Sequence, residues 1–590
     1  MYTPPRRAKI VATLGPSSSD EITIENLIRA GVNVFRLNFS HGTHEDHTKR
    51  FRIIRATSEK LQRPIAILQD LQGPKLRVGK FLEGSITLDK GENIELFYEE
   101  RNAKKKAEKT KKSALKQVPY NHKTLAHEVK PGHRILLDDG NLELVVTGSE
   151  GEIISAQVVF GGVLKDHKGM NFPDTRLKVD AFTEKDREDL LLGMKLGVDY
   201  VALSFVRTAT DVRNIQKFMH AHKKNIPVVS KIEKAEAIVN LPDILEVTDA
   251  VMVARGDLAV EVGTAQVPSL QKQIIRECKT RGIPVITATQ MLESMISSPR
   301  PTRAEASDVA NAVLDGSDAL MLSAESASGK FPILAVSTMH NIILETESRK
   351  DSTTAIEIPA KPMTLLRNPN QVNPEALAAL RGDAIEHAAA QISSWLDIRA
   401  IVCITHTGRS ARYLAKYRPR VQVFAMTDSV IVQRQLCLVW GIESTVIKES
   451  EDLEKISDQV EDQLIHRKIV SYGDQIIFTA GWPPLRHGTT NLLKILTIRK
   501  RPEALTKDGK KTGANPQHEN VQGYRTRQAQ FILDQNLCIQ CGGCVEVCPN
   551  DIFGTDGKKV FLKEPNCKNC TFDDACIQIC PTGAVEVIKF

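Results

Sequence analysis

Long apolar segments are absent from the sequence. No window approaches the roughly 18 uncharged apolar residues that a membrane span needs. The opening Met-Tyr-Thr-Pro-Pro-Arg-Arg lacks the apolar region of a secretory signal. We therefore expect a cytosolic protein without a membrane partner. The 590 residues are 41% hydrophobic, which excludes disorder of the chain as a whole and suffices for several domains, each with its own core.

The sequence also has little net charge and few aromatic side chains. The net charge is only +7, and much of it lies in residues 101–112 and 499–527. Neither stretch is interleaved with aromatic side chains that could stack on bases. We interpret both as solvated loops and expect no nucleic-acid partner; a patch for nucleic acid or anionic lipid is the alternative.

Cysteine is rare outside the C-terminal tail. Cys278, Cys403 and Cys437 stand alone, whereas the other eight of the 11 cysteines lie within residues 538–580. A reducing cytosol disfavours disulfides, so the crowded cysteines predict metal ligation. The three isolated thiols are predicted to be small buried hydrophobic residues.

Short β-branched runs alternate with helical patterns between residues 8 and 325. The runs lie at 9–14, 32–39, 65–71, 200–206, 227–232, 250–254, 284–288 and 319–322. Eight strand–helix units predict an α/β fold, a closed parallel (β/α)8 barrel. About 130 residues separate the third run from the fourth. Their period-two alternation at 84–88, 92–98, 133–140 and 142–146 predicts an inserted small β-barrel lid domain.

The composition also suggests domain boundaries. The barrel would comprise residues 1–71 and 169–350, and the lid residues 72–168. A second α/β domain would occupy residues 365–499, with a helix at 374–396 and strands at 400–405 and 421–427. Residues 500–527 are polar and contain Gly and Pro, which predicts a flexible linker to an α+β cysteine-rich domain at 528–590.

Charged residues follow the predicted barrel strands, where the catalytic groups of such barrels lie. Glu233 and Asp257 are hard oxygen ligands on neighbouring strands and suit Mg²⁺ or Mn²⁺. The basic residues that would face phosphate oxygens are Arg36, Lys75, Arg77 and Lys231. A solvated loop is the alternative for any single strand end. Together these residues are typical of phosphoryl transfer, and no Walker-type or kinase glycine-rich loop occurs, so the nucleotide must be held in another way.

The same strand ends closely resemble the signatures of the pyruvate kinase family. The motifs are Arg36-Leu-Asn-Phe-Ser-His-Gly, Asp70-Leu-Gln-Gly-Pro-Lys-Leu-Arg, Lys231-Ile-Glu-Lys-Ala-Glu-Ala, Met252-Val-Ala-Arg-Gly-Asp-Leu and Ala288-Thr-Gln-Met-Leu-Glu-Ser-Met. They occur in order, and the resemblance covers residues 1 to about 500. It implies phosphoryl transfer from phosphoenolpyruvate to ADP, giving pyruvate and ATP in the last step of glycolysis, by an allosteric homotetramer.

The resemblance also implies roles for individual residues. Lys231 would stabilise the transferring phosphoryl group and the enolate, while Glu233 and Asp257 would hold the divalent metal. The lid would close over the site and exclude water. The implied catalytic residues are Arg36, Arg77, Lys231 and Thr289; those that bind phosphoenolpyruvate are Arg36, Gly256, Asp257 and Thr289; those that bind nucleotide are Asn38 and Arg77.

A monovalent-cation site is implied in the same way. Asn38, Ser40, Asp70 and the carbonyl of Leu71 match the family's site. Lys75 stands where potassium-dependent members have glutamate, so its ammonium could lie where potassium otherwise would, and K⁺ would not be required. A surface lysine beside a turn is the alternative.

The segment after the predicted strand at 400–405 indicates a phosphate site, because backbone N–H groups at a helix start can hold a phosphate. It resembles the effector loop of pyruvate kinases activated by sugar phosphates or AMP. The implied ligands are Thr405, Thr407, Gly408, Arg409 and Ser410, and Trp482 and Arg486 could complete the pocket. An ordinary helix N-cap is the alternative.

The tail begins with a C-x2-C-x2-C-x3-C-P run, the pattern of bacterial two-cluster ferredoxins, in which the fourth cysteine ligates the other cluster. That rule assigns Cys538, Cys541, Cys544 and Cys580 to one [4Fe–4S] cluster, and Cys548, Cys567, Cys570 and Cys576 to a second. The five residues between Cys570 and Cys576 leave the nuclearity of the second cluster open. A pair of zinc sites is the alternative.

Two other functions remain as alternatives. One is a redox-responsive regulatory or binding protein with an inactive barrel, against which the intact Lys231, Glu233 and Asp257 argue. The other is an aldolase-type lyase acting on phosphoenolpyruvate, against which the lid and the second α/β domain argue. The tail could exchange electrons with a partner such as a pyruvate-consuming oxidoreductase, dock onto it, or sense redox state.

Overall fold

The computed structural model describes most of the chain. The described residues are 6–99, 115–349, 374–448, 452–482, 490–499, 521–525, 529–534, 553–555, 560–562 and 585–589. Within these residues, no helix combines the length and apolar character needed to cross a bilayer. The chain forms two compact units, one of residues 38–44 and 68–290 and the other of the remaining residues.

Eight strands close into a barrel in the order β1-β16-β15-β14-β13-β12-β3-β2, which confirms the predicted fold. They are β1 (Lys9–Thr13), β2 (Val34–Asn38), β3 (Ala66–Asp70), β12 (Tyr200–Leu203), β13 (Val228–Ile232), β14 (Ala250–Ala254), β15 (Val285–Ala288) and β16 (Ala319–Leu322). Parallel strands covered on both faces are buried along their length. Of the residues in these strands, only Arg36, Asn38 and Lys231 are not buried.

Helices follow the barrel strands, and local sequence signals set their ends. α5 (Glu184–Leu196) begins at a capping box of Thr183 and Asp186 and ends before Gly197, whose φ of 80° suits glycine. A capping box of Thr302 and Glu305 likewise starts α11 (Arg303–Leu314). The others are α1 (Glu21–Arg29), α2 (His44–Lys60), α6 (Ala209–Ala221), α7 (Ala235–Val239), α8 (Leu241–Leu245), α9 (Arg255–Val262), α10 (Val267–Arg281), α12 (Ala324–Ala327) and α13 (Pro332–Ser348).

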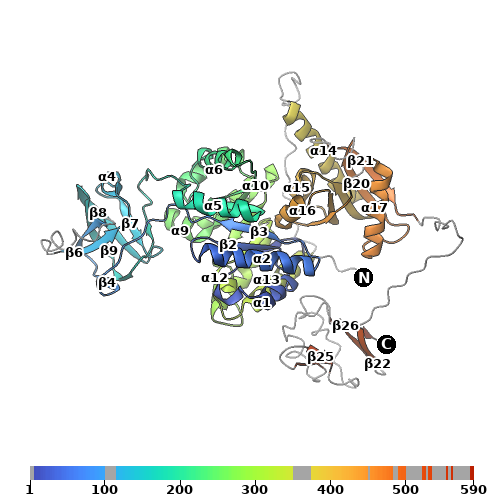
Figure 1. The fold of residues 1–590 in the computed structure, drawn as a ribbon, viewed down its shortest axis with the longest axis horizontal. Helices are drawn as coiled ribbons and strands as arrows, with labels where there is room; N and C mark the ends of the chain where they lie inside the picture. The colour runs from blue at the N-terminus through green and yellow to red at the C-terminus, as the bar shows by residue number, and fades with distance from the viewer. Residues whose placement is uncertain are drawn as a thin grey trace. The chain divides into compact units, whose positions relative to one another are not determined.

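The inserted lid consists of strands, as predicted (Figure 1). Its six-stranded sheet has the order β11-β7-β8-β9-β5-β6, and β4 (Ser85–Leu88) pairs with β10 (Gly162–Lys165). The sheet strands are β5 (Asn93–Tyr98), β6 (Lys116–Tyr120), β7 (Arg134–Leu137), β8 (Leu142–Glu150), β9 (Ile153–Phe160) and β11 (Met170–Asn171), accompanied by α4 (Leu125–Glu128). Alternate residues of β5, β8 and β9 are buried, because successive side chains of a strand point to opposite faces.

The second α/β domain contains a five-stranded sheet in the order β19-β18-β17-β20-β21, in which only β21 is antiparallel to its neighbour. Ala400, Val402 and Ile404 of β17 enter one core, and Ile401 and Cys403 enter another, so both faces are covered. The strands are β17 (Ile398–Ile404), β18 (Gln422–Thr427), β19 (Ile442–Val446), β20 (Gln475–Gly481) and β21 (Thr490–Thr497); the helices are α14 (Pro374–Trp395), α15 (Arg409–Lys416), α16 (Val430–Gln435) and α17 (Leu453–His466).

A buried ion pair joins this domain to the start of β16. Arg418 donates to the Asp318 carboxylate at 2.9 Å and to the Gly316 carbonyl at 2.6 Å. Both paired side chains are less than 10% exposed. The Trp440 amide also donates to Asp318, and the Arg418 guanidinium lies 4.6 Å from the centre of the Trp440 ring. We call this cluster of Asp318, Arg418 and Trp440 the β16 latch.

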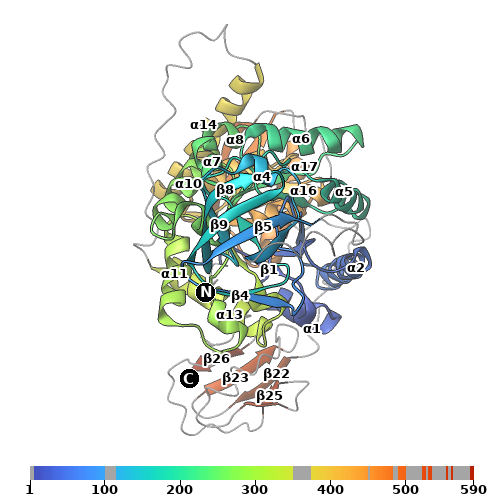
Figure 2. The same ribbon diagram turned by 90° about the vertical axis from the view of Figure 1, so that its left-hand side faces the viewer.

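The described part of the tail is a small antiparallel structure. β22 (Val521–Arg525), β23 (Ala529–Asp534) and β26 (Val585–Lys589) form one sheet, which Figure 2 shows, and β24 (Phe553–Thr555) pairs with β25 (Val560–Leu562). Pairing of β23 with β26 brings the two ends of the cysteine-rich segment together. The eight predicted ligand cysteines lie outside the described residues. The three isolated cysteines are buried, as predicted.

Candidate active site

Lys231 lies at the centre of the best-defined polar cluster, at the ends of β3, β12 and β13. Its ammonium is 2.7 Å from Ser204 Oγ, 2.9 Å from Glu233 Oε1 and 3.3 Å from Asp70 Oδ1. The two carboxylates are only 1% exposed and Lys231 is 12% exposed. Because β12 pairs with both β3 and β13, the three strand ends converge. The Lys231 ammonium is thus held between two buried carboxylates, and the lysine side chain keeps a small exposed surface.

Glu233 has a second partner and a shifted pKa. Its Oε2 accepts from the Phe205 amide at 2.6 Å. Burial raises the pKa of Glu233; Lys231 lowers it and the negative charge of Asp257 raises it further. Two neighbouring carboxylates of this kind fit a hard divalent cation, which would offset their repulsion. Glu233 and Asp257 therefore fit the predicted Mg²⁺ or Mn²⁺ site.

Gly256 and Thr289 lie together at the ends of β14 and β15. The Gly256 amide, in the first turn of α9, donates to Thr289 Oγ1 at 2.9 Å. Thr289 and Gln290 have φ values of 70° and 53°, which only a few per cent of non-glycine residues adopt. Arg255 donates to the Thr289 carbonyl at 2.7 Å and so supports this backbone. Strained backbone of this kind gathers at functional sites.

The four residues of the predicted monovalent-cation site also come together. The Phe39 amide donates to the Asp70 carbonyl at 2.9 Å, which joins the loop after β2 to the end of β3. Within the first loop, Asn38 Oδ1 accepts from the Ser40 amide at 3.1 Å. The Leu71 carbonyl accepts from Ser204 Oγ at 2.8 Å. Ser204 therefore bridges Lys231 and this group of oxygens.

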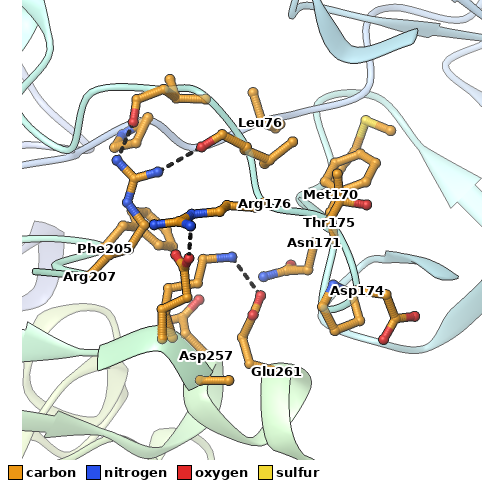
Figure 3. Close-up of a pocket in the computed structure, with 18 of the residues that line it drawn as sticks. Leu76, Met170, Asn171, Asp174, Thr175, Arg176, Phe205, Arg207, Asp257 and Glu261 are labelled. Atoms are coloured by element: carbon orange, nitrogen blue, oxygen red, sulfur yellow. Dashed lines mark hydrogen bonds and ion pairs between the residues drawn. The ribbon is translucent and has the colours of Figure 1, made fainter. Parts of the chain in front are cut away.

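A cavity of about 240 Å³ lies beside these strand ends, between the barrel and the lid connectors (Figure 3). Lys75, Phe205 and Asp257 are among its lining residues. A Cβ placed on Gly169 would stand 3.4 Å from Lys75 Cε, so the Lys75 side chain lies against Gly169, just before β11. The Arg77 guanidinium donates to the His167 carbonyl at 2.8 Å and is held within the lid. Arg36 donates to Thr13 Oγ1 at 3.1 Å.

The predicted effector loop precedes α15. Gly408 has a φ of 75°, a left-handed conformation that glycine adopts without strain. Ser410 Oγ is already paired with Thr490 Oγ1 at 2.6 Å, and His406 Nδ1 lies 2.7 Å from Asp428. Trp482 is 54% exposed. Residue 486 lies outside the described part of the chain, and the effector site stays a prediction.

Ser204 is the residue of this site that the sequence analysis missed. It is 2% exposed and contacts both Lys231 and Leu71. The sequence signal that could have identified Ser204 is its position directly after the last residue of β12, because the other strands carry their polar groups at the same end. A serine at a strand end has no spacing pattern of its own, and its partners are 27 and 133 residues away.

A closed barrel with a cluster of buried charged groups at the ends of its strands is typical of an enzyme, and comparison with known proteins gives its family. Residues 5–336 match the pyruvate kinase barrel domain and residues 383–496 the pyruvate kinase alpha/beta domain. The chain belongs to the pyruvate kinase family. Residues 530–581 match a 4Fe-4S dicluster domain.

Curated relatives agree over most of the chain. It is 43% identical to pyruvate kinase 2 of Synechocystis over 84% of this chain and 80% of the relative. It is 40% identical to the pyruvate kinase of Geobacillus stearothermophilus, with the same coverage, and 41% identical to that of Clostridium perfringens over 84% of this chain and all of the relative. The resemblance found in the sequence is confirmed, and membership implies phosphoenolpyruvate and ADP as substrates and a divalent metal.

Proposed function

We propose that the site around Lys231 transfers the phosphoryl group from phosphoenolpyruvate to ADP. The observation that carries the proposal is the Lys231 ammonium held by Ser204, Asp70 and Glu233 in an almost fully buried setting. Charge stabilisation is strongest where water is excluded and the groups are already in place. A coupled assay of pyruvate formation tests it, and absence of turnover with phosphoenolpyruvate, ADP and Mg²⁺ would refute it.

The residues around Lys231 would bind the substrates and the metal. The Gly256 amide and the Thr289 hydroxyl would receive anionic oxygens of phosphoenolpyruvate, since Gly256 lies in the first turn of α9, where the helix dipole favours negative charge, and Thr289 Oγ1 is 2.9 Å from its amide. Glu233 and Asp257 would hold a divalent metal, which when bound would neutralise phosphate charge. Lys231 would stabilise the phosphoryl group in transit and the enolate that remains. Arg36 and Arg77 would bind phosphate oxygens, and Asn38 the nucleotide.

We extend the proposal to Lys75 as an internal replacement for potassium. Full activity is expected in potassium-free buffer, and Lys75→Glu is expected to require added K⁺, because the substitution removes a positive charge and restores the negative charge that potassium-dependent members of the family have at this position. Rates of both proteins at increasing K⁺ concentration measure this.

The matched control is Lys80→Glu. Lys80 is exposed and lies five residues further along the chain, just past the connector, and the substitution makes the same change of charge. It should leave the potassium response unchanged. Strong activation of the unmodified protein by potassium would contradict the role of Lys75.

For the tail we propose one-electron transfer through two [4Fe–4S] clusters held by the cysteines assigned above. The proposal is supported by the match to a dicluster domain and by the cysteine spacing. Because the barrel site produces pyruvate, a pyruvate-consuming oxidoreductase is a fitting redox partner. We further propose a homotetramer with a phosphate-binding effector site at Thr405, Thr407, Gly408, Arg409 and Ser410.

The tail is expected to be an independent module. A chain ended after residue 500 should retain kinase turnover within about twofold, since the proposed barrel residues all precede residue 290. The full chain, purified without oxygen, should contain about eight iron atoms and show low-potential one-electron reduction. Loss of kinase folding on truncation would contradict independence, and preferential binding of zinc after anaerobic reconstitution would contradict the cluster assignment.

A further inference from the structure

We infer that Arg207 is a positioning residue that fixes the lid's return connector, residues 172–180, to the barrel. Lid movement would then be confined to residues 74–75 in the outgoing connector and to Arg176 in the return connector, whose ion pair with Glu236 of α7 is exposed and therefore weak. The inference rests on the proposed function, because it concerns a lid that closes over the phosphoryl-transfer site.

The outgoing connector, residues 72–78, is held at both ends. The Gly73 amide donates to the buried Asp186 carboxylate at 3.1 Å. A Cβ on Gly73 would stand only 2.9 Å from Phe205 and Ser204 side-chain atoms, so the connector presses on the barrel there. On the lid side, the Leu76 carbonyl accepts from the Met170 amide at 3.0 Å. Residues 74 and 75 remain between these fixed points.

The return connector is attached to the lid through its first half. Arg134 makes a two-pronged ion pair with Asp174, with Nε and Nη2 each at 2.9 Å from a carboxylate oxygen. Thr175 Oγ1 lies 2.9 Å from His133 Nδ1. One further lid contact falls later, where the Lys178 amide donates to Glu128 at 3.0 Å.

The second half of the return connector is attached to the barrel mainly by Arg207, next to an exposed ion pair of Arg176 with Glu236 of α7 at 3.0 Å. Its Nη1 donates to the Leu177 carbonyl at 2.7 Å and its Nη2 to the Val179 carbonyl, as the dashed lines in Figure 3 show. The carbonyls of residues 177 and 179 thus face Arg207, while the Lys178 amide between them faces Glu128 on the lid. Two charge-assisted bonds from one rigid guanidinium outweigh the single bond to Glu128.

Arg207 is itself firmly placed. Its amide donates to the Asp211 carboxylate, and its carbonyl accepts from Asn240, each at 2.9 Å. It also lines the same cavity as Asp257, the proposed metal ligand. Arg207 therefore ties the lid connector to the wall of the site, and when the lid moves, the Lys178–Glu128 bond is the contact that yields.

The test compares Arg207→Met and Arg207→Lys with Arg213→Met in the full chain. Arg213 is an exposed arginine of α6, the helix that follows Arg207. Turnover is measured with saturating substrates, and hydrogen–deuterium exchange is followed in peptides covering residues 172–182. For Arg207→Met we expect kcat to fall between about tenfold and a hundredfold, because small misplacement of reacting groups is costly, and exchange at residues 176–180 to quicken about tenfold. Arg207→Lys can reach one carbonyl, so its kcat and exchange rate should lie between those of Arg207→Met and the unmodified protein. Arg213→Met should have the kcat and exchange rate of the unmodified protein.

The two readouts separate the possible results. Unchanged kcat and exchange in Arg207→Met would overturn the inference, and so would a lower kcat with unchanged exchange, because Arg207 would then act directly on the substrate. If Arg207→Met does not fold, Arg207→Lys carries the same comparison. A failure of the proposed function would appear in the unmodified protein as absent turnover, whereas the exchange measurement would still test the anchor.

Discussion

Replacing Lys231 with methionine is expected to lower kcat by about a thousandfold or more, because charge stabilisation made chiefly in the transition state is lost. The side chain keeps a similar length, so the cavity is not emptied. The substitution leaves Asp70 and Glu233 without the cation that lies 3.3 and 2.9 Å from them. Turnover is therefore measured together with circular dichroism, in the presence of Mg²⁺.

The matched control is Lys272→Met, at an exposed position of α10. It should keep the full rate. A folded Lys231→Met protein that turns over at a near-normal rate would show that the phosphoryl group is stabilised elsewhere, and the assignment of the site would have to be abandoned.

Replacing Asp318 with alanine is expected to cost about 3–5 kcal/mol of stability, since it leaves the buried Arg418 charge without its partner. The Trp440 amide loses an acceptor at the same time. Urea unfolding measures the loss. Trp440 is buried against Arg418, whereas Trp395 and Trp482 are 74% and 54% exposed, so the change in fluorescence on unfolding reports mainly on the β16 latch.

An exposed ion pair provides the comparison for Asp318. Glu345 and Arg349 are 2.8 Å apart with side chains 67% and 74% exposed. Glu345→Ala should cost no more than about 0.5 kcal/mol, because water already solvates both charges. Equal effects of the two substitutions would mean that the latch contributes no more than a surface pair.

The barrel strands could be predicted because their sequences are apolar on both faces. β14 and β16 have the predicted bounds, and the other strands lie inside the predicted runs, shortened by one to three residues at an end. The shortening is greatest at residues 200–206, where the run continues past Leu203 into Ser204 and Phe205. A run of apolar residues gives no sign of the point at which backbone pairing stops.

The lid was harder to predict, and one of its missed strands has a physical reason. β6 contains Pro119, which argues against a strand in the sequence, yet it pairs with Phe97 at the edge of the sheet. An edge strand tolerates proline, because one row of its amides needs no partner. β9 was not predicted although it alternates regularly.

The residues of the candidate site could likewise be predicted only in part. Lys231, Glu233 and Asp70 could be named from the sequence because their residue types at strand ends limit the chemistry. Ser204 could not, and neither could the path of the Lys75 stem along Gly169, because both depend on contacts between distant parts of the chain. The roles assigned to the individual residues and the domain boundaries stay predictions.

The two ends of the lid meet, with the Met170 amide donating to the Leu76 carbonyl at 3.0 Å. The chain of more than 90 residues between Leu76 and Met170 therefore starts and ends at one point. The entropy of closing a loop grows only with the logarithm of its length, so to the folding barrel this long insertion resembles a modest surface loop. A whole domain can then be gained at a strand end without disturbing the eightfold order of the strands, which is how a barrel common to many chemistries can acquire a cover of its own.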